Sequence, residues 1–179
     1  MEESNELSID GKKLSLFIRN EEIMSRVKNV ASQLQNDFGD ANPVFLCVLK
    51  GVFIFAADLL RAFGRPCEVS FVEISSYEGT ESTGKIKTVL GLSNRLRGRN
   101  VVIVEDIIDS GLTMKYLVEQ VKTYEPKDVR IVSLFTKPEN LKHGVHVDYH
   151  CFEIPNRFIV GYGLDYNQQF RNLSDIYAL

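Results

Sequence analysis

The segment 105–113 gathers three carboxylates, two hydroxyls and a glycine, and it follows a short apolar run at 101–104. Its sequence is Glu-Asp-Ile-Ile-Asp-Ser-Gly-Leu-Thr. Gly111 lets the backbone approach a ligand closely, and the free N–H groups at the start of the following helix bind phosphate. Carboxylates at the same edge bind sugar hydroxyls or a hard metal ion. The segment therefore predicts a site for a ligand that carries a phosphate, a ribose and a metal ion.

A competing interpretation is that Asp109 or Ser110 only caps a helix, which is a common role for these residue types. That explanation suffices for one such residue taken alone. It does not explain the whole string, in which two acids and two apolar residues precede Asp-Ser-Gly-x-Thr directly after a buried strand. The complete pattern favours the binding site.

The elements that position this segment are predicted from the periodicity of apolar residues. Apolar residues at helical spacing predict amphipathic helices at 20–38, 53–63 and 114–124. Continuous apolar runs predict buried strands at 44–49, 68–74, 101–104, 130–136, 147–154 and 158–164. Their alternation indicates an α/β fold with a parallel central sheet flanked by helices. With a strand that ends at Val104, Glu105 and Asp106 lie at the carboxyl edge of the sheet, where ligands of such sheets bind.

The stretch 75–87, SSYEGTESTGKIK, is polar and rich in Gly, Ser and Thr, and it separates two strand-like segments. This pattern predicts a long loop. Loops of this length in compact domains are often functional lids.

Taken together, these segments resemble the type I phosphoribosyltransferases, and among them the hypoxanthine-guanine branch. The resemblance covers nearly all of 44–173, and its markers are 49–51, 75–84, 101–113, Lys137 and 158–171. It implies a single phosphoribosyltransferase domain over 1–179. It also implies a small hood, built from the N-terminal segment and about 155–179, and a flexible lid loop.

The activity that the resemblance implies is purine salvage. The 5-phosphoribosyl group of phosphoribosyl pyrophosphate would pass to hypoxanthine or guanine, giving IMP or GMP and pyrophosphate, with Mg²⁺ as cofactor. Pyrophosphate would leave ribose C1 through an oxocarbenium-like transition state. The expected assembly is a homodimer or a homotetramer.

On the side of phosphoribosyl pyrophosphate, residue roles follow from the resemblance. Asp109 corresponds to the general base that shares the purine N7 proton, and Glu105 and Asp106 to acids that hold the ribose hydroxyls near magnesium. The implied 5′-phosphate turn is Ser110, Gly111, Leu112 and Thr113. The implied pyrophosphate contacts are Lys50, Gly51 and Arg171, with a cis peptide bond between Leu49 and Lys50.

On the side of the base, Lys137 corresponds to the lysine that donates to purine O6, which selects hypoxanthine and guanine over adenine. Phe158 corresponds to the ring that stacks on the purine, and the Ile159 carbonyl to the acceptor of the guanine 2-amino group. Asp165 corresponds to an acid that reaches magnesium through water. The implied metal set is therefore Glu105, Asp106 and Asp165. In the lid, Ser76 and Tyr77 correspond to residues that cover the reacting centre and exclude water.

Composition argues against other classes of function. The 179 residues are 44% hydrophobic and 25% charged, which suits one compact domain, and the net charge of -3 argues against a nucleic-acid partner. No apolar run reaches the roughly 18 residues of a membrane helix. The acidic start, MEESNELSID, is unlike a signal peptide, and the three cysteines form no C-x-x-C pair. We expect a cytoplasmic protein with no membrane partner.

Two alternatives keep the 101–113 motif. A regulator on the same fold would sense phosphoribosyl pyrophosphate while binding RNA or DNA, but the acidic charge and the lack of a leading DNA-binding domain disfavour it. A transferase for adenine or a pyrimidine is disfavoured by Lys137 together with FIVGYGLDY at 158–166.

Overall fold

The computed structural model describes residues 6–76, 86–88 and 91–179. Most of the predicted lid, including Tyr77, lies outside the described residues, as does the side chain of Ser76. Within the described part, no helix combines the length and apolar character needed to cross a bilayer.

The core is a six-stranded sheet in the order β5-β4-β3-β6-β7-β8. Pairing along β4, β3, β6, β7 and β8 is parallel throughout, as the alternating pattern predicted, and β5 adds an antiparallel edge. The strands are β3 (Val44–Leu49), β4 (Glu68–Ser76), β5 (Ile86–Thr88), β6 (Asn100–Ile108), β7 (Asp128–Thr136) and β8 (Tyr149–Glu153).

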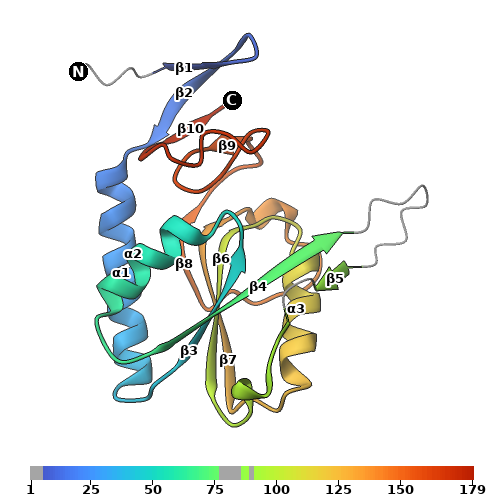
Figure 1. Ribbon diagram of the computed structural model, residues 1–179. Coiled ribbons are helices and arrows are strands. Elements are labelled where there is room, and N and C mark those ends of the chain that lie inside the picture. Colours follow the sequence, from blue (N-terminus) through green and yellow to red (C-terminus); the bar gives the residue numbers. More distant parts are fainter. Residues whose placement is uncertain (1–5, 77–85, 89–90) are drawn as a thin grey trace.

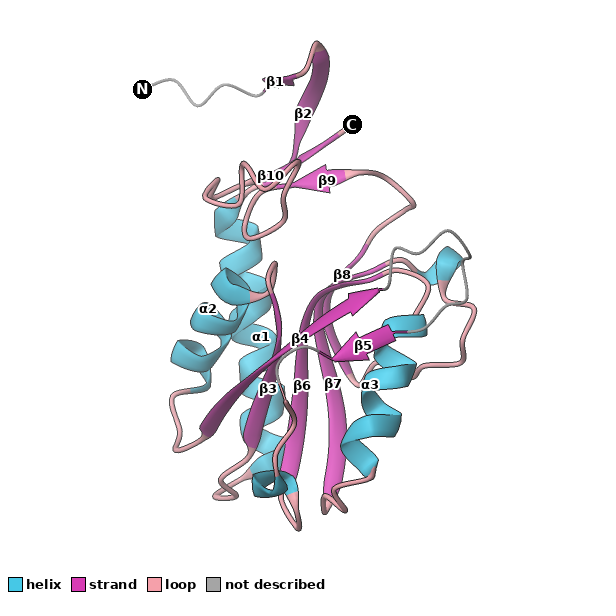
Figure 2. Cartoon of the chain, turned by 45° about the vertical axis from the view of Figure 1, so that its right-hand side comes forward, coloured by secondary structure: helices cyan, strands magenta, loops and turns pink. Residues whose placement is uncertain are grey.

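Three helices cover the two faces of this sheet (Figure 1, Figure 2). They are α1 (Asn20–Phe38), α2 (Phe53–Phe63) and α3 (Leu112–Lys122). Because strand side chains alternate between faces, Val102 and Val104 of β6 pack in the cluster with α1 and α2, whereas Val101 and Ile103 pack with α3. Both faces of the central strands are therefore buried, which explains their continuous apolar runs. Two short 3-10 helices, η1 (Asn94–Leu96) and η2 (Pro138–Asn140), lie in the connections.

A second sheet brings the two ends of the described chain together (Figure 1). It is antiparallel, in the order β1-β2-β10-β9, with β1 (Glu6–Ile9), β2 (Lys12–Ile18), β9 (Ile159–Val160) and β10 (Ile176–Ala178). Ile18, Ile159 and Ile176 face the main core, so the two sheets share one apolar interior. The apolar pattern did not predict β1, β2 and β10. It also predicted β9 too long, because glycines 161 and 163 turn the chain at positive φ.

The predicted end of β6 was also wrong. Strand β6 does not end at Val104 but runs through both acids to Ile108, because β7 continues to pair with it from Glu105 to the end. On its other side, pairing with β3 stops at Cys47 opposite Val104. From Glu105 onward, β6 therefore has one open edge, and the two acids lie on strand rather than beyond it.

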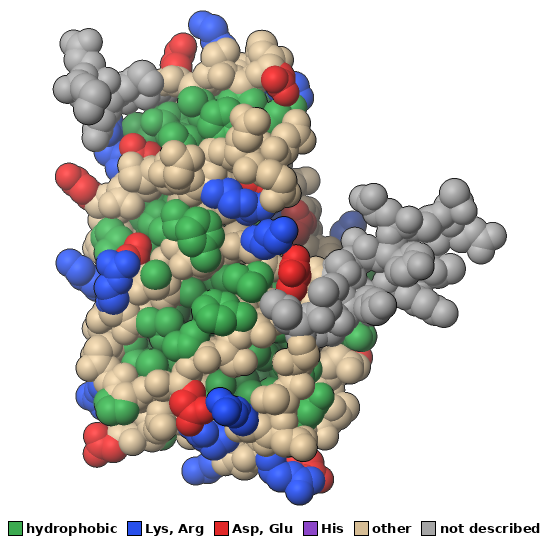
Figure 3. Space-filling model, in the orientation of Figure 1, with side chains coloured by type: hydrophobic (Ala, Val, Ile, Leu, Met, Phe, Trp, Pro, Cys, Tyr) green, Lys and Arg blue, Asp and Glu red, His purple; other side chains and the backbone are tan. Residues whose placement is uncertain are grey.

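Hydrophobic side chains gather on the outer face over α2 and β4 (Figure 3). Phe53 at the start of α2 is 46% exposed, and Val69 and Phe71 of β4 are 44% and 47% exposed. Exposed apolar residues that lie close together often mark a surface that another protein covers.

Candidate active site

The site lies where β3 and β6 diverge. From β3 the chain continues outward to β4, and from β6 it continues in the opposite direction to β7 and β8. This reversal creates a crevice at the carboxyl ends of the two central strands, which is where ligands of open α/β sheets bind. The segments that leave these two strands, 50–51 and 109–113, are the two that the sequence predicted for pyrophosphate and phosphate binding.

The predicted phosphate turn forms a hollow at the start of α3. A cavity of about 130 Å³ is lined by Glu105, Ile107, Ile108, Asp109, Ser110, Gly111, Thr113 and Met114. Gly111 has φ 81° and ψ -3°, a left-handed conformation that glycine adopts without strain, and helix α3 begins at the next residue. The Leu112 N–H donates to Ser110 Oγ at a nitrogen–oxygen distance of 3.4 Å, and the Leu112 side chain is 41% exposed. The turn therefore brings two hydroxyl residues, Ser110 and Thr113, to the lining of the hollow.

Two neighbouring acids, Glu105 and Asp106, lie on β6 beyond its last pairing with β3, and Glu105 lines the hollow. Glu105 is buried, with 8% of its surface exposed. Burial raises the pKa of Glu105 well above its usual value, and the adjacent Asp106 raises it further. Burial also raises the pKa of Asp106, although hydrogen bonds and the charge of Arg171 act in the opposite direction. A cation or a pair of sugar hydroxyls would restore the solvation that these carboxylates lose on burial.

Close backbone contacts join the loop after β3 to the segment 161–171. A side chain on Gly51 would overlap Oδ2 of Asp106 and lie 3.6 Å from Nη1 of Arg171. A side chain on Gly163 would overlap the carbonyl oxygen of Gly51. The peptide bond between Leu49 and Lys50 is cis, as the resemblance implied. Two glycines therefore allow the loop after β3, Asp106 of β6 and Arg171 to meet.

The predicted pyrophosphate and metal residues of the C-terminal segment are paired with each other. Arg171 Nη2 is 2.7 Å from Oδ1 of Asp165 and 3.3 Å from Oε1 of Gln168, and Arg171 Nη1 donates to the Gly163 carbonyl at 2.8 Å. Lys50 extends to solvent, with Nζ 3.9 Å from Glu73. Asp165 and Arg171 are thus positioned as one unit. Within 6–76, 86–88 and 91–179, no group of three or more His, Cys, Asp or Glu side chains is arranged to hold a metal ion.

Asp109 is held by two donors, one on each oxygen. Lys137 Nζ lies 3.0 Å from Oδ2, and Asn140 Nδ2 lies 2.7 Å from Oδ1. The Lys137 ammonium also donates to Oδ1 of Asn156 at 3.3 Å. Burial acts to raise the pKa of Asp109, but the hydrogen bonds from Lys137 and Asn140 outweigh it, and the pKa lies below its usual value. The structure therefore brings together the predicted base and the predicted purine-binding lysine.

The contacts of Asn140 with Asp109 and of Asn156 with Lys137 were not predicted from the sequence. Asn140 ends η2, three residues after Lys137, and Asn156 follows Pro155 in an irregular segment. Neither asparagine belongs to a periodic pattern or to a motif. Only the fold reveals their contacts, because Asn140 and Asp109 are 31 residues apart in the chain.

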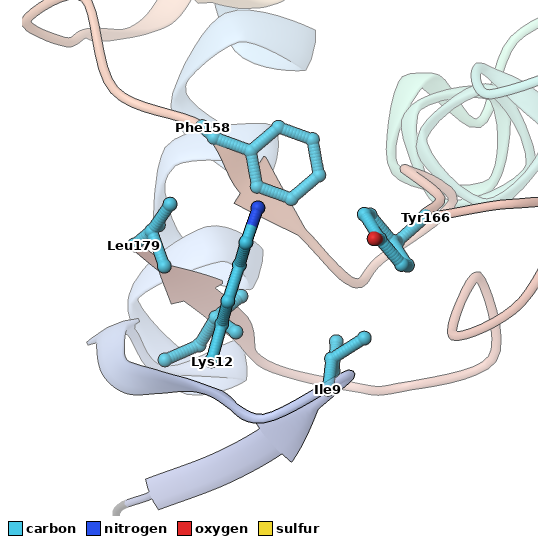
Figure 4. Close-up of a pocket in the computed structure, with 6 residues that line it drawn as sticks. Ile9, Lys12, Phe158, Tyr166 and Leu179 are labelled. Carbon is cyan, nitrogen blue, oxygen red and sulfur yellow. The ribbon is translucent and has the colours of Figure 1, made fainter.

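Phe158 directly precedes β9 and meets Tyr166 edge to face, with ring centroids 5.9 Å apart and an interplanar angle of 83°. Figure 4 shows the two rings above a small apolar pocket, with the side chain of Lys12 extending toward Phe158. The pocket has a volume of about 240 Å³ and is lined by Ile9, Lys12, Leu14, Phe158, Tyr166 and Leu179. Phe158 is 44% exposed, so its ring is available for contact with a ligand. Ile159, the next residue, is buried in β9.

Comparison with known proteins gives a consistent result. A family model described as a phosphoribosyl transferase domain matches residues 17–167. Hypoxanthine-guanine phosphoribosyltransferase of Bacillus subtilis is 41% identical over 165 residues, covering 92% of each chain. The Aquifex aeolicus enzyme of the same name is 40% identical over 173 residues, covering 96% of this chain and 97% of its own. A crystal structure of hypoxanthine-guanine phosphoribosyltransferase from Bacillus anthracis superimposes with a TM-score of 0.87 at 40% identity, covering 92% of this chain and 98% of that one.

Proposed function

The chain belongs to the phosphoribosyl transferase family and acts in purine salvage, and from this premise we propose how its own residues bind the substrates and transfer the phosphoribosyl group. The substrates are phosphoribosyl pyrophosphate and the 6-oxopurines hypoxanthine and guanine, and the products are IMP or GMP and pyrophosphate. The observation that carries the assignment of roles is the 3.0 Å contact between Lys137 Nζ and Asp109 Oδ2, at the rim of the phosphate-binding hollow.

Asp109 is the general base. Its pKa is lowered by its two donors, so the carboxylate is ionised at neutral pH and can share the proton of purine N7. As pyrophosphate leaves and the purine attacks ribose C1, the purine ring becomes positively charged. The adjacent Asp109 carboxylate stabilises that charge.

Lys137 determines which purine the enzyme accepts as substrate. An ammonium has three N–H donors, of which one is directed to Asp109 and one to Asn156. The third donates to purine O6. Adenine has an amino group at that position, which cannot accept this bond and would leave a buried donor unpaired.

Glu105 and Asp106 hold the ribose hydroxyls. Glu105 is buried and lines the hollow, which makes its hydrogen bonds with the sugar strong. The negative charge of the two acids favours a ribose that becomes cationic at C1. The turn 110–113 binds the 5′-phosphate through its backbone N–H groups and two hydroxyls. These two groups of contacts fix ribose C1 between the purine and the pyrophosphate leaving group.

Enzymes of this family use Mg²⁺ with phosphoribosyl pyrophosphate. Carboxylate oxygens are the ligands that Mg²⁺ prefers, and one or two carboxylates with substrate oxygens and water complete its shell. The donor set of Glu105 and Asp106 fits this pattern, and Asp165 would take part through water. When bound, the ion neutralises the charge of the pyrophosphate leaving group. Lys50, Arg171 and the backbone of Gly51 add to that neutralisation.

Phe158 stacks on the purine, and the Ile159 carbonyl accepts from the 2-amino group of guanine. The lid role that the resemblance implies for Ser76 and Tyr77 concerns Tyr77 and a Ser76 side chain that lie outside the described residues.

The chain assembles as a homodimer or a homotetramer. The exposed apolar residues of α2 and β4 support this proposal, since a second subunit would remove them from water. The protein acts in the cytoplasm without a nucleic-acid or membrane partner, consistent with its acidic charge and its three free cysteines.

Initial rates with single bases test the proposal. The purified enzyme, with saturating phosphoribosyl pyrophosphate and Mg²⁺, should convert hypoxanthine and guanine and leave adenine and pyrimidines unchanged. Lys137→Ala should weaken purine binding and discrimination while the Michaelis constant for phosphoribosyl pyrophosphate stays the same. Turnover of adenine at a rate similar to hypoxanthine, or equal losses for both substrates in the variant, would exclude the proposed role of Lys137.

A further inference from the structure

We propose that Asn140 is a positioning residue for the reaction. Through its side-chain amide it fixes the orientation of the Asp109 carboxylate and favours its ionised form. The inference rests on the proposed role of Asp109 as the base and adds a residue that no sequence pattern indicated.

The geometry assigns the two carboxylate oxygens to different partners. Asn140 Nδ2 lies 2.7 Å from Oδ1, and Lys137 Nζ lies 3.0 Å from Oδ2. With Lys137 alone, the carboxylate could turn about its Cβ–Cγ bond while keeping that one contact. A second donor on the other oxygen fixes the plane of the group, and a base must be oriented as well as close to act on one proton.

Exposure makes this second contact important. The Asp109 side chain is 51% exposed, whereas that of Lys137 is 10% exposed. The lysine is therefore held by its surroundings, but the carboxylate is not, and packing does not determine its rotamer. Hydrogen bonds are the constraint that remains.

A purely local role for the Asn140 side chain is not required by the fold. The turn of η2 is closed by the backbone, because the Asn140 N–H donates to the Lys137 carbonyl at 3.0 Å and the Leu141 N–H donates to Pro138 at 3.3 Å. The amide of Asn140 is thus free to serve Asp109. A variant at this position removes a contact with the base and leaves the backbone turn in place.

The charged groups around Asp109 stay unchanged in such a variant. Lys137 faces it from the end of β7, and Glu105 lines the same hollow from β6. Among the described residues, no hydrogen bond joins the side chain of Lys137 or Glu105 to the side chain of Asn140. Any change in the titration of the base can therefore be assigned to the lost amide.

Two variants and a control test the proposal. Asn140→Ala removes the donor, and Asn140→Asp replaces it by an acceptor of the same shape. Glu139→Gln is the matched control, because Glu139 is an exposed neighbour in the same 3-10 helix. For each protein, kcat and kcat/KM for hypoxanthine are measured between about pH 5 and 8, together with the melting temperature and the Michaelis constant for phosphoribosyl pyrophosphate.

We expect Asn140→Ala to lower kcat by about five- to twentyfold, the loss of one hydrogen bond to a charged group that is half exposed. Loss of the donor raises the pKa of Asp109, so the acid limb of the rate profile moves to higher pH. In Asn140→Asp the shift is larger, because a second carboxylate opposes ionisation. The melting temperature and the Michaelis constant for phosphoribosyl pyrophosphate should match those of Glu139→Gln and the unmodified protein.

Combination with Asp109→Asn separates this inference from the proposed function. If Asp109→Asn alone retains near-normal turnover, the base role is wrong, whatever Asn140 does. If Asp109→Asn is impaired and Asn140→Ala adds no further loss to it, the two residues act as one unit, as proposed. An undiminished additional loss in the double variant overturns the inference. So does an unchanged pH profile in both Asn140 variants.

Discussion

The two sides of the crevice differ in how their residues are brought together. The phosphate side lies in one continuous stretch, 105–113, where a strand, a turn and a helix follow one another. The opposite side, in 156–171, depends on contacts with distant residues, such as Gly163 against Gly51 and Arg171 beside Asp106. Chemistry that resides in one stretch can be identified from residue types, whereas chemistry built from distant segments depends on how closely backbones can approach.

Substitution of Asp109, the proposed general base, should give the largest loss of activity on the side of the crevice formed by 105–113. Asp109→Asn keeps the shape of the side chain but cannot accept the N7 proton, and general acid–base catalysis contributes about 10²–10⁴-fold in rate. Turnover should fall within that range while the melting temperature changes little, since the lost ion pair is half exposed. Steady-state kinetics and a thermal melt check both parts. Near-normal turnover would remove Asp109 from the base role.

Alanine substitutions at Gly51 and Gly163 should have different effects, one mainly on substrate binding and the other mainly on stability. Both test the side of the crevice that is built from distant segments. In Gly163→Ala the new Cβ overlaps backbone, at φ 101°, so we expect the free energy of unfolding to fall by roughly 2–3 kcal/mol. In Gly51→Ala the overlap is with the carboxylate end of Asp106, which can rotate away. The Michaelis constant for phosphoribosyl pyrophosphate should then rise about tenfold or more, with a smaller loss of stability. Urea unfolding and substrate titration measure the two effects. Equal behaviour of the two variants would contradict the described junction.

Removal of a buried charge should stabilise the protein at a cost in activity. Burial raises the pKa of Glu105 in the folded protein well above its usual value of 4.5. Ionisation therefore favours the unfolded chain, and the folded protein loses stability as the pH rises above 4.5. Glu105→Gln removes this loss and should raise the melting temperature at neutral pH by about 2–4 °C, the shift that roughly 1 kcal/mol gives in a chain of this size.

The comparison is made without substrate and in the presence of a chelator. The advantage of Glu105→Gln should shrink as the pH falls, because at low pH the carboxyl is protonated in both the folded and the unfolded state. Activity should fall because an amide holds the ribose hydroxyls less strongly than a carboxylate. A variant that is less stable than the unmodified protein at every pH would show that Glu105 is ionised and well solvated by its neighbours.

The smallest effect is expected at Leu112, whose side chain is 41% exposed and whose N–H serves the turn. Leu112→Ala should leave the Michaelis constant for phosphoribosyl pyrophosphate within about threefold, or roughly 0.7 kcal/mol. Gly111→Val should abolish binding of the 5′-phosphate, because φ 81° disfavours a branched side chain and the new Cβ would lie 3.3 Å from Leu141. One titration of the two variants decides this. A severe loss in Leu112→Ala with a tolerated Gly111→Val would disprove binding by the backbone of the turn.

The sequence by itself determined the parallel core and the turn at 110–113 that leads into a helix. Continuous apolar runs such as 44–49 require burial on both faces, and Gly111 between two hydroxyl residues requires a close approach to a helix start, so each signal is local. The same local logic placed the end of β6 too early, because the open edge beyond Val104 depends on where β3 stops pairing. It could not find the antiparallel sheet either, since β2 and β10 have little apolar periodicity and pair across the whole length of the chain.

Only the tertiary structure decided which polar groups meet. The contact of Asn140 with Asp109 and the approach of Gly51 to Gly163 each join segments that no periodic pattern relates. These contacts depend on how the segments after β3, β6, β7 and β9 meet. The donor–acceptor distance of a hydrogen bond varies by only a few tenths of an ångström. The order of residues along the chain does not specify distances between side chains at that scale.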